Sequence, residues 1–122
     1  MARRKLATGE LESKVLEVLW DAGQALTPGA VHQRLFPERP LAYTTVMTIL
    51  TRLWNKGVLE RSREGRAFAY RPILGRAEHT AQRMREILQG AGSRADALAS
   101  FVGAMDAKER AQLRRMLGRG TR

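Results

Sequence analysis

Small polar side chains recur through residues 42–56 at spacings typical of one side of a helix. Thr44, Thr48 and Arg52 follow one another at intervals of four residues. A threonine hydroxyl hydrogen-bonds a base edge, its methyl group contacts the thymine methyl, and an arginine binds a guanine edge or a phosphate. Threonine has a poor helix propensity, so its density here indicates selection for something other than stability. The pattern predicts a helix that reads the major groove of DNA.

The other side of the same segment is apolar. Its members are Val46, Ile49, Leu50 and Leu53. We therefore expect a helix over residues 42–56 that is anchored by one face and exposed by the other. Thr45 flanks the exposed face and joins Thr44, Thr48 and Arg52 as a predicted DNA contact. The alternative is an ordinary amphipathic helix with a threonine-rich exterior.

A second group of cations surrounds a predicted tight turn at Glu64-Gly65. Residues 58–63 and 66–71 alternate like the two strands of a hairpin, and Pro72 closes it. The arginines around the turn are Arg61, Arg63, Arg66 and Arg71. Such a wing can lay guanidinium groups along the phosphate backbone, and Arg63 and Arg66 are the predicted contacts. The alternative is that these arginines are only the soluble ends of a surface hairpin. Phe68 and Tyr70 are expected to point inward and close the core.

Two earlier helices are expected to hold the reading helix. The apolar stripe of the first is Leu11, Val15, Val18 and Leu19, and Gly23 ends it. Thr27-Pro28 pairs an N-cap with a proline at the first helical position, and Val31 and Leu35 point inward from the second helix. Three helices followed by a two-stranded hairpin form the mainly α order of a winged helix-turn-helix. We predict that residues 1–73 are a winged-helix DNA-binding domain.

Residues 74–122 return to helical periodicity and are predicted to be a helical dimerisation region. Their apolar stripes would be exposed if the region stood alone. Pairing with a second copy buries them and places two reading helices on half-sites one helical turn or a multiple apart. The predicted dimerisation residues are Met84, Leu88, Leu98, Phe101, Val102, Leu113, Met116 and Leu117. The alternative is that these helices fold back on their own winged domain.

The composition supports a polyanionic partner. The formal net charge is +10 at pH 7 and there is no cysteine. A chain with this much positive charge is expected to bind nucleic acid, and an anionic membrane surface ranks second as a partner. The lack of cysteine excludes a disulfide framework, a zinc ribbon and a thiolate metal sensor. No stretch approaches the roughly 18 apolar residues of a membrane span. We expect a cytoplasmic, nucleoid-associated protein with no signal peptide and no membrane insertion.

Residues that could support catalysis are sparse. The two histidines, His32 and His79, lie far apart in the sequence. An HExxH motif, a glycine-rich phosphate loop and a nucleophile elbow are all absent. We therefore expect no enzymatic activity, no catalytic residue, no metal ion and no cofactor.

Residues 42–48, Ala-Tyr-Thr-Thr-Val-Met-Thr, resemble the recognition-helix string of the penicillinase repressor family, the BlaI/MecI type. The string continues with Leu50, Arg52-Leu53 and Lys56-Gly57. Residues 11–20 resemble the first helix of that family, and Arg66-Ala67 with Tyr70 resembles its wing. The resemblance extends over nearly the whole chain, with the third-helix string as its most specific part.

This resemblance implies a bacterial winged-helix repressor with a role in antibiotic resistance. It implies binding to palindromic operators as a homodimer through the C-terminal helices, and it adds Tyr43 and Met47 to the predicted DNA contacts. Met47 lies between the threonines, where it can touch a base methyl. A copper-responsive branch of the family uses a C-terminal cysteine cluster, and this chain has no cysteine.

The resemblance also implies a way of releasing the DNA. In the better known members a membrane sensor protease responds to β-lactam or a cell-envelope signal, and the repressor is cut just before a Phe-Val pair. The matching place is Ser100-Phe101-Val102, with Ser100 where those members have asparagine. Phe101 is also compatible with a dimer core, and the two roles do not exclude each other. The alternative function is a general DNA binder or a protein-interaction adaptor without a proteolytic switch.

Overall fold

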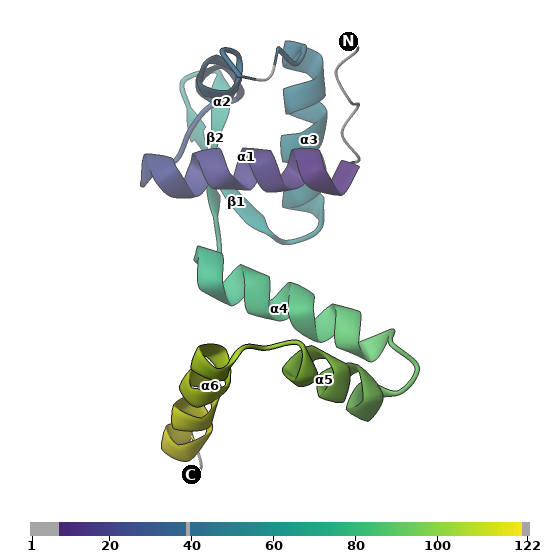
Figure 1. The fold of residues 1–122 in the computed structure, drawn as a ribbon. Helices are drawn as coiled ribbons and strands as arrows, with labels where there is room; N and C mark the ends of the chain where they lie inside the picture. Colours follow the sequence, from purple (N-terminus) through teal and green to yellow (C-terminus); the bar gives the residue numbers. More distant parts are fainter. Residues whose placement is uncertain (1–7, 39, 121–122) are drawn as a thin grey trace. The chain divides into compact units, whose positions relative to one another are not determined.

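The computed structural model describes residues 8–38 and 40–120, and within them the chain is mainly helical (Figure 1). Its elements are α1 (Thr8–Ala22), α2 (Pro28–Leu35), α3 (Tyr43–Asn55), β1 (Leu59–Glu64), β2 (Ala67–Pro72), α4 (Arg76–Gln89), α5 (Arg94–Gly103) and α6 (Ala107–Gly120). The chain divides into two compact units, an N-terminal unit that ends at Glu78 and a C-terminal unit that begins at His79. Three helices and a two-stranded wing make up the first unit, which confirms the predicted fold class.

The predicted helix ends are set by local signals. Gly23 follows α1 with a φ of 67°, the left-handed conformation that glycine adopts without a Cβ clash. The Thr27 side chain accepts a hydrogen bond from the amide of Ala30 at 3.3 Å and so caps α2, with Pro28 in the first turn. These residues act at the positions where the sequence predicted them.

Helix α3 lies within the predicted residues 42–56, with Ala42 and Lys56 as its two caps. Ala42 has no side-chain cap, and the short connection before α3 is held by the ring of His32. His32 Nε2 donates to the carbonyl oxygen of Leu41 at 2.9 Å. His32 therefore has a structural role in joining α2 to the start of the predicted reading helix.

The hairpin corrects the predicted turn by one residue. Glu64 pairs with Ala67, so the turn consists of Gly65 and Arg66 rather than Glu64 and Gly65. Gly65 has a φ of 65°, and no described residue other than glycine has a positive φ. A two-residue hairpin with glycine first matches a type II′ turn. The right-handed twist of the strands favours this placement, which puts Arg66 at the tip of the wing.

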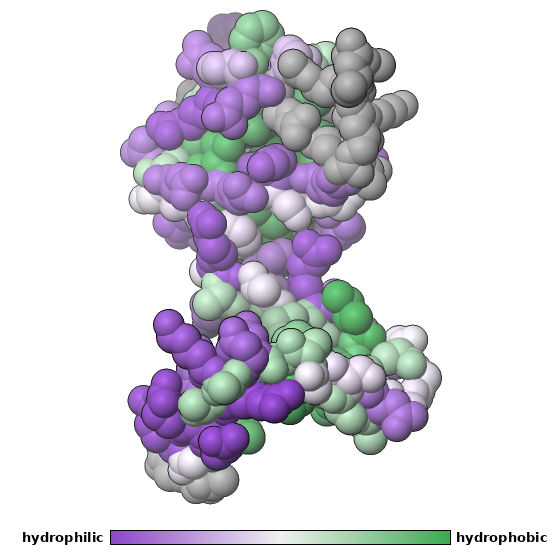
Figure 2. Space-filling model, in the orientation of Figure 1, coloured by the Kyte–Doolittle hydropathy of each residue, from purple (hydrophilic) through white to green (hydrophobic). Residues whose placement is uncertain are grey.

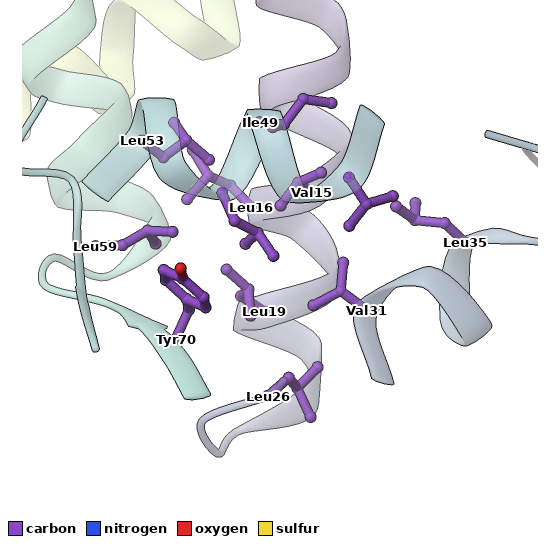
Figure 3. Close-up of a cluster of buried hydrophobic side chains, with 12 residues drawn as sticks. Val15, Leu16, Leu19, Leu26, Val31, Leu35, Ile49, Leu53, Leu59 and Tyr70 are labelled. Carbon is purple, nitrogen blue, oxygen red and sulfur yellow. The ribbon is translucent and has the colours of Figure 1, made fainter. Parts of the chain in front are cut away.

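A single core joins the elements of the N-terminal unit (Figure 3). Its members are Val15, Leu16, Leu19, Leu26, Val31, Leu35, Val46, Ile49, Leu50, Leu53, Leu59 and Tyr70. The predicted stripe of α1 omitted Leu16, which is buried, while its members Leu11 and Val18 are partly buried and pack against the core. Leu26 and Tyr70 exchange two backbone hydrogen bonds of 2.9 and 2.8 Å, which tie the link before α2 to the wing.

The residues after the wing stay attached to α1. Trp20 Nε1 donates to the carbonyl oxygen of Leu74 at 3.0 Å. Arg76 Nη2 donates to Asp21 Oδ1 at 3.0 Å, and its Cζ lies 5.3 Å from the centre of the Trp20 ring. The N-terminal unit thus includes the first turn of α4. The division of functions between residues 1–73 and 74–122 stays a prediction.

The C-terminal unit has no buried residue among those that the structure describes. Its helices begin at strong local caps. The Ser93 side chain accepts from the amide of Asp96 at 3.1 Å, and Asp106 and Glu109 cap each other's amides at 3.0 and 2.8 Å. Hydrophobic atoms lie at the surface over α4 and α5 (Figure 2). In the described part of the chain, no helix has the length and apolar character needed to cross a membrane.

Candidate nucleic-acid interface

The outward face of α3 is polar and open to solvent, while its inward face is part of the core. Thr44, Thr48 and Arg52 are exposed, and Val46 and Leu50 are both fully buried. Because 3.6 residues make one turn, intervals of three and four keep each set on its own face. Burial of the apolar face of α3 in the core therefore leaves its polar face directed outward, where a ligand of this unit can contact it.

An open hollow of about 500 Å³ runs along this face. It is lined by Met47, Thr48, Thr51, Arg52, Asn55 and Lys56. Three predicted contacts, Met47, Thr48 and Arg52, are thus brought together. Thr51 and Asn55 complete the surface although they were not among the predicted contacts. Their spacing of seven residues from Thr44 and Thr48, two turns of helix, was the signal that could have included them.

Thr48 has a defined hydrogen-bonding state. Its hydroxyl donates to the carbonyl oxygen of Thr44 at 2.9 Å, one turn earlier in the helix. The hydroxyl proton is therefore used inside the helix. What Thr48 presents outward is a lone pair and a methyl group, which suit an amino group and a thymine methyl on base edges.

Tyr43 and Thr45, both in the first turn of α3, differ in how exposed their side chains are. Tyr43 is 47% exposed, and its ring lies edge-on to that of His32 with the centroids 6.0 Å apart. Thr45 is half-buried, and its amide donates to the carbonyl oxygen of Ala42 at 3.0 Å. Tyr43 is the more accessible of the two predicted contacts.

The four wing arginines do not form one solvent-facing cluster. Arg61 is half-buried, and its Cζ lies 3.6 Å from the centre of the Trp54 ring. Arg71 forms an ion pair with Glu60 on the neighbouring strand. Arg63 on β1 and Arg66 in the turn are both exposed, and the Cζ of Arg63 lies 5.3 Å from the centre of the Phe68 ring. The two arginines predicted as phosphate contacts are therefore exposed, as is Arg71, whose charge is paired with Glu60.

An ion pair joins the far end of α3 to α1. Lys56 Nζ lies 3.0 Å from both carboxylate oxygens of Glu12, whose side chain is only 13% exposed. Lys56 is the C-cap of α3, where a cation also favours the helix dipole. This contact supports the orientation of α3 at the end away from His32.

The predicted dimerisation residues lie on α4, α5 and α6 and most of them are exposed. Exposed fractions are 49% for Met84, 42% for Leu98, 55% for Phe101, 37% for Val102, 51% for Met116 and 62% for Leu117, while Leu88 and Leu113 are half-buried. Ile87, which was not among the predicted dimerisation residues, is 69% exposed, the most of any large apolar residue that the structure describes. Its position three residues after Met84 was the available signal. Ser100 is exposed within α5, directly before Phe101.

Groups of three or more histidine or acidic residues able to hold a metal ion are absent from the described residues. His32 is occupied by its hydrogen bond to Leu41 and lies in the N-terminal unit, whereas His79 begins the C-terminal unit. The chemistry that this surface offers is therefore hydrogen bonding, apolar contact and positive charge.

Comparison with known proteins gives consistent matches over both units. A family model described as the penicillinase repressor matches residues 8–119. The transcriptional regulator BlaI of Mycobacterium tuberculosis, in strains H37Rv and CDC 1551, is 42% identical over 112 residues, which cover 89% of this chain and 81% of that protein. A solution structure of the DNA-binding domain of the repressor BlaI superimposes with a TM-score of 0.52 at 26% identity, covering 64% of this chain and 93% of that domain.

Proposed function

Because this chain belongs to the penicillinase repressor family and is a transcriptional repressor with a DNA-binding winged-helix domain, not an enzyme, we propose that it acts as a homodimer on palindromic operators. In this proposal α3 enters the major groove and the wing lies on the adjacent backbone. Residues 1–73 bind DNA and residues 74–122 make the dimer. The observation that carries the proposal is the exposed polar face of α3 above a buried apolar face.

Base reading is assigned to the hollow on α3. Arg52 has the fork geometry for the two acceptors of a guanine edge. Thr48 offers an acceptor and a methyl group because its proton is bound to Thr44, and Met47 is 37% exposed beside it for contact with a base methyl. Thr44, Thr45 and Tyr43 at the start of the helix lie where a reading helix commonly approaches base edges and backbone.

Backbone contacts are assigned to the wing. Arg63 lies on β1 near the turn and Arg66 lies in the turn, and both are exposed, so their guanidinium groups are available to phosphates. Each phosphate that they neutralise contributes to affinity without contributing to sequence preference. Together with a +10 net charge, these residues favour DNA over a neutral protein partner.

Dimerisation is assigned to the apolar surface of α4, α5 and α6. Seven large apolar side chains are exposed there, Met84, Ile87, Leu98, Phe101, Val102, Met116 and Leu117. Large exposed apolar side chains gathered in one region mark interaction sites, and a second copy of the chain covers them while supplying the second reading helix for a palindrome.

Relief of repression is assigned to a cut between Ser100 and Phe101. Both residues are exposed, and the bond lies inside α5. Cutting there separates Phe101, Val102 and the whole of α6, with Leu113, Met116 and Leu117, from the part of the dimerisation surface on α4 and the start of α5. The proposed agent is a membrane sensor protease that responds to β-lactam or a cell-envelope signal, and the proposed place of action is the cytoplasm beside the nucleoid.

The test of operator reading begins with selection of a preferred duplex from a randomised pool by the full chain. Arg52→Ala is expected to weaken binding to that duplex by about 1–3 kcal/mol and to relax the preference at one base pair. Arg66→Ala is the matched control, because loss of a phosphate contact weakens binding to all duplexes alike. A chain that recovers no preferred duplex is a general DNA binder, and one that binds no duplex is an adaptor. Either result contradicts the proposal.

A further inference from the structure

Arg61 is the most enclosed of the wing arginines, and its contacts are with the protein itself. Its Cζ lies 3.6 Å from the centre of the Trp54 ring and 3.9 Å from that of Phe68. Its Nη1 also donates to the Tyr70 hydroxyl oxygen at 3.3 Å. A planar guanidinium group stacks well on aromatic rings and is weakly hydrated, so arginine suits this place better than lysine.

The strand register explains how these residues meet. Arg61 pairs with Tyr70 and Arg63 with Phe68, so the two arginines and the two rings share one face of the hairpin. At the base of that face Leu59 and Tyr70 are 2% and 3% exposed and belong to the core. Arg61 comes next toward the tip, where the core ends and the face meets Trp54 from the last turn of α3.

Trp54 contributes to this contact without belonging to the reading surface. It is 37% exposed and does not line the hollow formed by Met47, Thr48 and Arg52. The cation of Arg61 therefore bridges a ring of the reading helix and a ring of the wing. The wing beyond this point carries Arg63 and the turn residue Arg66, which are exposed.

We propose that Arg61 is a positioning residue that clasps the wing to the reading helix through Trp54 and Phe68. It sets the distance between the base-reading side chains of α3 and the phosphate contacts of the wing. Without it the outer wing pivots on the buried pair at its base, so binding must first restrict the wing to the position that Arg61 now fixes. The bound complex keeps the same phosphate contacts, but its affinity is lower. The inference rests on the proposed function, because it concerns how that DNA surface is held.

The first test measures DNA affinity of the full chain against salt concentration, with the duplex that the wild-type chain selects from a randomised pool. Arg61→Ala is expected to bind roughly tenfold more weakly, with the slope of log K against log salt unchanged. Arg66→Ala, the matched control, removes one phosphate contact from each protomer and is expected to reduce that slope by about 0.9 per protomer, hence about 1.8 for a dimer. A slope reduced by the same amount in Arg61→Ala overturns the proposal.

Arg61→Lys separates shape from charge. Lysine keeps a point charge that binds phosphate but lacks the planar group that fits between two rings. We expect Arg61→Lys to remain nearly as weak as Arg61→Ala. Recovery of wild-type affinity by lysine identifies Arg61 as a phosphate contact and refutes the clasp.

Trp54→Ala tests the clasp with the cation left in place and without dependence on the folding of the Arg61 variants. The clasp predicts weaker binding of roughly the same size as in Arg61→Ala and again an unchanged salt slope. Because the two residues act as a unit, the double variant is expected to lose less than the product of the two single losses. Wild-type affinity in Trp54→Ala, or independent losses in the double variant, contradicts the proposal.

Hydrogen exchange of the free protein keeps this inference separate from the proposed function. Arg61→Ala is expected to speed exchange of the β1 and β2 amides near the turn while amides of α3 around Leu50 stay protected. A wild-type chain that selects no duplex defeats the proposed function, yet this exchange pattern still decides whether the clasp exists. Unchanged exchange near the turn defeats the clasp alone.

Discussion

The N-terminal and C-terminal units are both helical, but they differ in what holds their helices. In the N-terminal unit five elements share one core, in which Val15, Val31 and Leu50 are fully buried. In the C-terminal unit the described residues include none that is buried, although the helices carry apolar side chains such as Phe101 and Leu117. The first unit folds around its own residues, whereas the second leaves its large apolar side chains exposed in the single chain, which is the basis for the proposed dimer.

Local signals are correspondingly more important in the second unit. Helices α4, α5 and α6 have 14, 10 and 14 residues, a length at which isolated helices are marginal in water. Caps at Ser93 and at the Asp106–Glu109 pair satisfy amides at their starts. The comparison indicates that caps define where the helices of this unit begin, and under the proposed function association supplies the stability that a core supplies in the first unit.

The largest expected effect is on the free energy of unfolding, when a buried side chain of the N-terminal unit is truncated and compared with an exposed one of the C-terminal unit. Leu50→Ala removes a fully buried side chain and is expected to lower the free energy of unfolding of the N-terminal unit by about 2–5 kcal/mol. Leu117→Ala, at a side chain that is 62% exposed, is expected to leave that transition unchanged. Both tryptophans, Trp20 and Trp54, lie in the N-terminal unit, so urea unfolding followed by tryptophan fluorescence reports on it alone. Equal losses in the two variants would contradict the difference between the units.

A charge on the apolar surface of α5 tests the need for a partner. Phe101 is 55% exposed in the single chain, so Phe101→Glu is expected to leave the fluorescence-detected unfolding intact. If a second copy covers this side chain, burying a charge there costs about 2 kcal/mol or more, which weakens the dimer at least roughly thirtyfold. Sedimentation equilibrium measures that change. Ala99→Glu, exposed on another side of the same helix, is the control and is expected to remain dimeric.

The smallest expected effect compares one cap from each unit. Thr27→Ala removes the cap of α2 and is expected to lower the unfolding free energy of the N-terminal unit by about 1 kcal/mol. Ser93→Ala removes the corresponding cap of α5 and is expected to leave tryptophan-detected unfolding unchanged while reducing helix content in the monomer. Circular dichroism at concentrations below the dimer dissociation constant detects that loss. A shift of the fluorescence transition by Ser93→Ala would show that the two units unfold together.

Much of the fold could be predicted because its signals lie within one or two turns of chain. The cap at Thr27, the end at Gly23 and the two faces of α3 all depend on neighbours in sequence. The turn at Gly65-Arg66 was misplaced by one residue, because alternation alone leaves the strand register open until cross-strand pairs form. The burial of Leu16 in place of Val18 also depends on how α1 is rotated against α2 and α3.

The sequence by itself determined which residues α3 buries and which it presents, since helical periodicity separates Val46 and Leu50 from Thr48 and Arg52 without reference to the rest of the chain. It determined in the same way that helices follow the wing, because helical periodicity returns in residues 74–122. Only the tertiary structure decided the state of the wing arginines, which sequence makes equivalent cations. Arg61 is stacked between Trp54 and Phe68, while Arg66 is left at the tip. That difference depends on contacts between side chains distant in the chain, and no local pattern encodes them.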